Sequence, residues 1–185
     1  MNQNNINKWN EKYTYSISEQ QKIDMELLKN NIPGCVKVAK TEPGFDMLGV
    51  DYIATLTGGA QIYIDAKTRM PGCSKWWKNG EPDLALELWS DIDAKKDGWT
   101  LSTTTPVDFI LYTFDGSDWD KSYLISFQLL RAALIKNMDL WIKTYGTKKQ
   151  TSSNSYGDVW YGEAMFIPVS VVLAAVNQTK IIQVS

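Results

Sequence analysis

Apolar residues recur at helical spacing near the start of the chain. Ser18 and Gln21 have the spacing of a capping box, and the apolar stripe that follows stops at the Pro-Gly pair over 33–34. This pattern predicts a first helix over about residues 18–31. Two valines over 36–38 indicate a short strand after it.

The next segment has the pattern of a β-hairpin. Residues 50–56 and 61–66 are two strand-like runs, joined by Thr-Gly-Gly-Ala over 57–60, whose glycines supply the positive φ of a tight turn. In the second run, apolar residues alternate with polar ones. We therefore expect this hairpin to have one apolar face, toward a core, and one charged face.

The rest of the chain contains segments with helical spacing of apolar residues and segments with strand-like alternation. Leucines alternate over 84–88 as in a strand, and VDFILYTF over 107–114 predicts a central strand. The pattern further predicts a helix over 122–137 that begins near a short strand, a mobile loop over 147–157, a helix from Pro168 to about Asn177, and a last strand over 181–184.

These elements predict a single domain over residues 1–185, with 1–15 as an N-terminal extension. The fold class is α/β (α+β), a mixed β-sheet flanked by helices. With 185 residues and 44% hydrophobic content, the chain is long enough for a sizeable core. Residues 1–10 lack a signal-peptide pattern, and the longest apolar run is too short for a membrane helix. We expect no membrane association and a cytoplasmic location.

Composition narrows the possible chemistry. The chain has no histidine, which excludes Ser-His-Asp and Cys-His catalysis and imidazole zinc sites, so a metal would need oxygen ligands. Two cysteines, Cys35 and Cys73, make neither a disulfide framework nor a four-cysteine zinc site, although one bridge remains open. The net charge of -2 means that nucleic-acid binding would depend on local patches.

Three charged residues of the hairpin are expected to converge. Asp65 and Lys67 are two apart on one strand and share a face, and Asp51 on the partner strand should pair close to Ala66. Two adjacent carboxylates repel unless a cation neutralises them or one is protonated, and Mg²⁺ binds such oxygen ligands. A nearby lysine suits metal-assisted phosphodiester hydrolysis. The alternative is a surface hairpin whose Asp-Lys pair has little energetic value.

Residues 49–69, GVDYIATLTGGAQIYIDAKTR, resemble the core motif of the PD-(D/E)XK nuclease superfamily, which has the restriction-endonuclease-like fold. In this motif an acid on one hairpin strand is followed by acid-any-Lys on the next. The preceding helix and strand match the opening αβββ order, and ALELWS, DGWTL and VDFILYTF are similar to segments of phage-encoded members. Two features depart from the motif: no proline precedes Asp51, and Asp65 replaces the usual Glu.

The resemblance covers about residues 18–114 and implies a Mg²⁺- or Mn²⁺-dependent nuclease. Asp51 and Asp65 would be metal ligands, and Lys67 would position water and phosphate. Glu87 has the polarity pattern to sit on a neighbouring strand, facing the site as an auxiliary acid and ligand; a solvent-facing glutamate is the alternative. In related nucleases a glutamate of the first helix also reaches the metal, a role open to Glu19 or Glu26, which are otherwise exposed helix residues.

Other residues near the hairpin carry weaker expectations. Asp46 is expected to make a turn, and Trp99, after Gly98, is interpreted as structural. A basic, aromatic segment follows the hairpin, in which tryptophans would stack on bases while cations meet phosphates; core packing is the alternative. The candidate nucleic-acid-binding residues are Arg69, Lys75, Trp76, Trp77 and Lys78.

The sequence therefore predicts a metal-dependent nuclease that hydrolyses phosphodiester bonds, with DNA as the expected substrate. The acidic composition favours a structured substrate or a partner protein, and a homodimer is compatible with it. The alternative is a catalytically idle nuclease-like fold that binds protein or nucleic acid, for example a phage protein that blocks a host defence or repair enzyme. Cleavage of RNA or tRNA is a third, weaker hypothesis.

Overall fold

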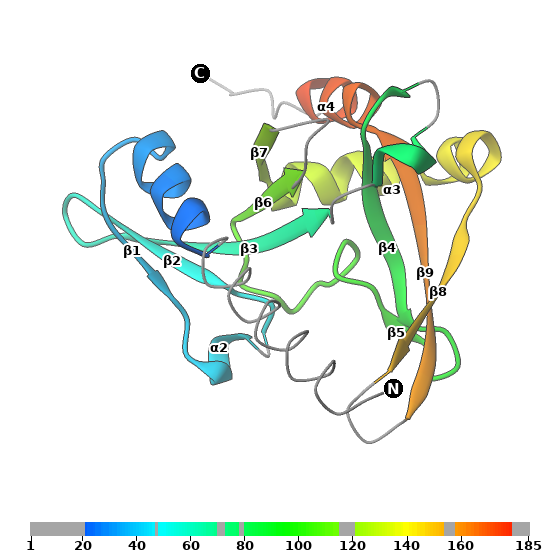
Figure 1. Cartoon of the computed structure of the whole chain (residues 1–185), viewed down its shortest axis with the longest axis horizontal. Coiled ribbons are helices and arrows are strands. Elements are labelled where there is room, and N and C mark those ends of the chain that lie inside the picture. The colour runs from blue at the N-terminus through cyan, green and yellow to red at the C-terminus, as the bar shows by residue number, and fades with distance from the viewer. Residues whose placement is uncertain are drawn as a thin grey trace, which may run out of the picture.

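The computed structural model describes residues 21–46, 48–69, 73–77, 80–114, 121–153 and 158–178 (Figure 1). Within them the chain is α+β, with a mixed β-sheet, a second sheet and helices packed against both. Residues 21–31 form the first helix, and the other helices are α2 (Pro43–Asp46), the short 3₁₀ helix η1 (Cys73–Trp76), α3 (Phe127–Tyr145) and α4 (Val169–Gln178).

The first sheet has five strands in the order β1-β2-β3-β6-β7. Their bounds are Cys35–Lys40, Tyr52–Leu56, Gln61–Arg69, Phe109–Phe114 and Lys121–Ser126. Only β3 and β6 pair in parallel, and the other neighbours are antiparallel. In the β2–β3 hairpin Tyr52 lies opposite Ile64, and the turn glycines Gly58 and Gly59 have φ of 92° and 88°, as the sequence predicts.

The first helix covers one face of this sheet. Leu28 of this helix and Ile32, directly after it, are buried against Tyr52, Ile64 and Leu111. The alternation in β3 thus places Ile62, Ile64 and Ala66 in this small core, and Asp65 and Lys67 on the opposite face.

The second sheet is antiparallel and has the order β5-β4-β9-β8. Its strands are β4 (Asp83–Asp91), β5 (Lys96–Asp97), β8 (Lys148–Ser153) and β9 (Val159–Pro168). It packs on the face of the first sheet that carries Asp65, where Leu86 and Ile167 meet Ile110 and Tyr112 in the larger core (Figure 1). The predicted charged face is therefore a second interior face, and its charges lie beside an apolar core.

Several predicted elements are confirmed: the helix within 21–31, the strand after it, the hairpin, the strand over 84–88, the interior strand β6 and the helix after Pro168. The mobile loop expected over 147–157 is wrong for residues 148–153, which form β8. The helix expected to end at Asn137 runs on to Tyr145. The N-terminal extension 1–15 and the strand over 181–184 lie outside the described residues.

Two global features follow from the described residues. Cys35 and Cys73 are both free thiols. None of the helices in the described ranges has the length and apolar character needed to cross a membrane.

Candidate active site

Asp51 stands immediately before β2 and is fixed through its backbone and its side chain. Its N–H donates to the Ile64 carbonyl at 2.9 Å, and its own carbonyl accepts from the Thr41 N–H at 2.9 Å. Its Oδ2 accepts from the Ala66 N–H at 2.7 Å. The predicted approach of Asp51 to Ala66 is confirmed, because the register Tyr52 to Ile64 leaves the next position opposite Asp65.

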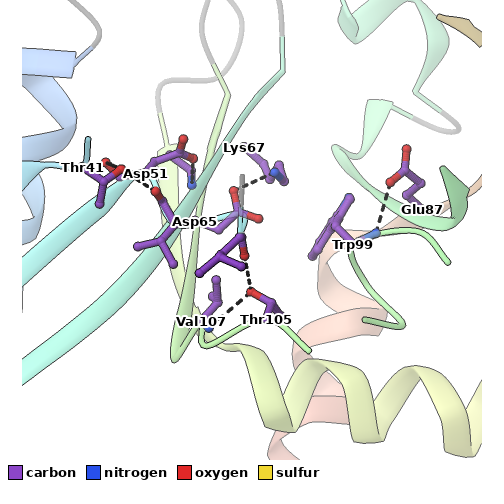
Figure 2. A network of polar contacts seen from close by, with 11 residues as sticks. Thr41, Asp51, Asp65, Lys67, Glu87, Trp99, Thr105 and Val107 are labelled. Atoms are coloured by element: carbon purple, nitrogen blue, oxygen red, sulfur yellow. Dashed lines mark hydrogen bonds and ion pairs between the residues drawn. The ribbon is translucent and has the colours of Figure 1, made fainter. Parts of the chain in front are cut away.

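Asp65 and Lys67 share a face of β3 and form an ion pair. The Lys67 Nζ lies 2.6 Å from Asp65 Oδ1 (Figure 2). Asp65 is only 4% exposed, whereas a third of the Lys67 side chain (33%) meets solvent. The convergence of Asp51, Asp65 and Lys67 is confirmed, but the pair is partly buried, and a surface hairpin with a solvated pair is therefore excluded.

The buried carboxylate of Asp65 has an unusual electrostatic environment. Burial raises the pKa of Asp65 to about 7; the Lys67 ammonium opposes this shift, and the nearby Asp51 carboxylate adds to it. The single ammonium therefore does not compensate two carboxylates at this depth. Strongly shifted groups beside a specific charge partner are typical of functional sites, although structural networks also produce them.

A pocket of about 230 Å³ opens beside Asp65. Its apolar lining includes Ile110 and Phe127, and residues of the second sheet and of the turn after β5 also line it. The polar or aromatic side chains that line it are Asp65, Glu87, Ser90, Lys96, Asp97, Trp99, Ser102 and Thr105. Asp65 thus borders a pocket large enough for a small chemical group and several waters.

Glu87 lines the same pocket as Asp65, but it approaches from the second sheet. The expectation that its strand neighbours the hairpin is wrong, because β6 pairs with β3, and β4 belongs to the second sheet. The Glu87 Oε2 accepts a hydrogen bond from the backbone N–H of Trp99 at 3.1 Å. Glu87 lies on the far side of Trp99 from Asp65 (Figure 2). In the described ranges, no three His, Cys, Asp or Glu side chains gather closely enough to hold a metal ion.

The first helix carries a buried acidic residue, Asp24, that the sequence analysis did not single out. Asp24 is 2% exposed, and its Oδ2 accepts from the Tyr52 hydroxyl at 3.0 Å. Asp24, Leu28 and Ile32 follow one another at intervals of four residues, so an acidic residue stands within the apolar stripe. This pattern is the signal in the sequence that could have identified Asp24 as buried. Glu26 is exposed on this helix, Glu19 lies outside the described residues, and Asp46 ends α2.

The candidate nucleic-acid-binding residues divide into several groups. Arg69 is turned inward: its Nη2 lies 2.8 Å from Asp83 Oδ1, and its guanidinium lies 5.1 Å from the Phe166 ring centroid. The expectation that Arg69 meets phosphates is therefore at odds with its position, since β3 extends to include it and faces the second sheet.

Trp77 also packs inward, edge-on to Phe114 at 6.0 Å between ring centroids, which favours the core alternative. Lys75 is exposed on η1. Trp76 belongs to η1, but its side chain, like all of Lys78, lies outside the described part of the structure.

Comparisons with protein-family models, with curated proteins and with solved structures find no match for this chain.

Proposed function

We propose that the chain is a metal-dependent nuclease with a restriction-endonuclease-like core, acting on DNA. The observation that carries this proposal is the meeting of Asp51, Asp65 and Lys67 beside a pocket, on two adjacent strands of a mixed sheet. The opening order of helix, β1, β2 and β3, followed by a parallel β6, also supports this kind of core.

The two aspartates suit Mg²⁺ or Mn²⁺. Both offer hard oxygen donors, and each has one carboxylate oxygen besides the one engaged by Ala66 or Lys67. Burial raises the pKa of Asp65 and the neighbouring Asp51 adds to this shift, so a divalent cation would stabilise the ionised form of the pair. When bound, the cation would polarise the phosphate and make a water molecule more acidic.

The protein groups have distinct tasks in this proposal. The Ala66 N–H fixes the Asp51 carboxylate through Oδ2, so that the whole carboxylate has a defined direction. Lys67 carries a compact, mobile ammonium that can approach a phosphate oxygen and offset the negative charge that develops there. The apolar side chains that line the pocket lower the local dielectric and strengthen both effects.

A cleavage assay tests this proposal. Labelled single-stranded, duplex and branched DNA are incubated with the protein and Mg²⁺, Mn²⁺ or EDTA, with Asp65→Asn as a parallel sample. We expect cleavage of at least one substrate that requires the metal and disappears in the variant, because an amide cannot compensate the cation's charge. Silence of the wild type with both metals on every substrate, or equal cleavage by Asp65→Asn, would contradict the proposal.

A second candidate is a binding module on the same scaffold. It is favoured by the ion pair itself, since Lys67 already neutralises one carboxylate without a metal. It is also favoured by the absence of a third acidic ligand within the described ranges. This candidate predicts no cleavage under any metal and a partner protein or nucleic acid that binds in EDTA.

A further inference from the structure

Glu87 and Trp99 form a closely built unit on the wall of the pocket. The Gly98 N–H donates to the Leu88 carbonyl at 2.8 Å, which brings the turn against β4. A Cβ at Gly98 would lie 2.3 Å from the Glu87 carbonyl oxygen and 2.7 Å from its Cγ, so only glycine fits there. The next residue, Trp99, donates its backbone N–H to Glu87 Oε2. The carboxylate and the glycine together fix the backbone from which the indole ring projects.

The Trp99 indole ring faces Lys67 of β3. The Lys67 Nζ lies 5.6 Å from the Trp99 ring centroid, within the range of a cation–π interaction, while it also touches Asp65 Oδ1 at 2.6 Å. Figure 2 shows Trp99 between Lys67 and Glu87. One ammonium thus has a carboxylate on one side and an aromatic face on the other.

This arrangement addresses a conflict within the site. Lys67 engages Oδ1 of Asp65, and a divalent cation bound to the other oxygen of the same carboxylate would lie close to the ammonium. Because two cations repel at such distances, we expect the ammonium to shift away from Asp65 when a divalent cation binds. A lysine with a third of its side chain exposed would otherwise turn into solvent and lose its place in the site.

We propose that Trp99, whose backbone is held by Glu87, is a positioning residue that keeps the Lys67 ammonium next to the site after it shifts away from Asp65. The aromatic face offers an attractive place that does not compete for oxygen ligands. The inference rests on the proposed metal site, and it gives Glu87 an indirect role instead of ligation.

Fluorine NMR tests this inference without relying on activity. The protein is produced with 5-fluorotryptophan, the Trp99 signal is assigned by its loss in Trp99→Phe, and Mg²⁺ is titrated while calorimetry follows binding. We expect the Trp99 signal to shift with Mg²⁺ in the wild type, because the ammonium moves toward the ring. Lys67→Met keeps both carboxylates and should still bind Mg²⁺, but in this variant the shift should be lost.

Mg²⁺ binding with an unmoved Trp99 signal, or the same shift in Lys67→Met, would overturn this inference and leave the proposed function standing. Absence of Mg²⁺ and Mn²⁺ binding by the wild type would instead overturn the proposed metal site, and the inference with it. In the cleavage assay, Trp99→Leu should lower kcat about tenfold with little change in KM or in metal affinity, whereas Trp99→Phe should keep most of the rate. Equal rates for Trp99→Leu and Trp99→Phe would count against the positioning role.

Discussion

Substitution of Lys67 by alanine is expected to lower metal-dependent cleavage by a factor on the order of 100 or more. The Lys67 ammonium lies 2.6 Å from Oδ1 of Asp65, the aspartate that borders the pocket. Its loss removes positive charge that would be needed most in the transition state. Single-turnover rates at saturating Mn²⁺, compared between wild type and Lys67→Ala, measure the effect.

Two control substitutions distinguish a specific role of the Lys67 ammonium from a general effect of positive charge. Lys67→Arg should not restore the rate, because the planar guanidinium is broader than an ammonium and cannot lose a proton. Lys143→Ala, which removes an exposed lysine from α3, should leave the rate within twofold of the wild type. Cleavage that survives Lys67→Ala unchanged would indicate a contaminating nuclease and would contradict the role of Lys67.

Replacement of Asp65 by asparagine is expected to stabilise the metal-free protein at pH 8 but not near pH 4. Burial raises the pKa of Asp65 from 3.8 to about 7, so the folded state binds more protons than the unfolded state between these values. Its stabilising contribution is complete below the unfolded pKa and is lost as pH rises through the folded pKa. The loss has an upper bound of about 4 kcal/mol at 1.4 kcal/mol per pKa unit.

Urea unfolding of both proteins in EDTA from pH 4 to pH 8 measures this difference. The advantage of Asp65→Asn should grow between about pH 4 and pH 7 and level off above. The exposed Asp139→Asn on α3 is the control and should follow the wild type. A pH-independent difference between Asp65→Asn and the wild type would show that Asp65 keeps an ordinary pKa in the fold.

The site was predictable from the sequence to the extent that it is local. The Gly-Gly turn sets the hairpin register, and the register and the two-residue period bring Asp51, Asp65 and Lys67 together. The same reasoning fails for Glu87 because its polarity pattern fits a strand of either sheet. The sequence around β4 does not indicate which sheet this strand joins. The long-range pairing of β3 with β6 takes the position beside the hairpin, and β4 pairs with β9 in the second sheet.

The second sheet was missed for a related reason. β8 reads KKQTSS, and most of its side chains are exposed because it is an edge strand, so its composition is that of a loop. Its partner β9 was obscured because its apolar end runs into α4 at Pro168. The position of Arg69 depends on this sheet, since Asp83 and Phe166, its partners, lie on β4 and β9.

The most direct measurement is a calorimetric titration of the purified chain with Mn²⁺ at pH 7.5, alongside Asp51→Asn, Asp65→Asn and the control Asp139→Asn. We expect saturable binding by the wild type and Asp139→Asn, with proton release because a cation displaces the proton from a carboxyl of raised pKa. Both site variants should show no binding. Equal Mn²⁺ binding by all four proteins, or none by the wild type, would contradict a metal site at Asp51 and Asp65.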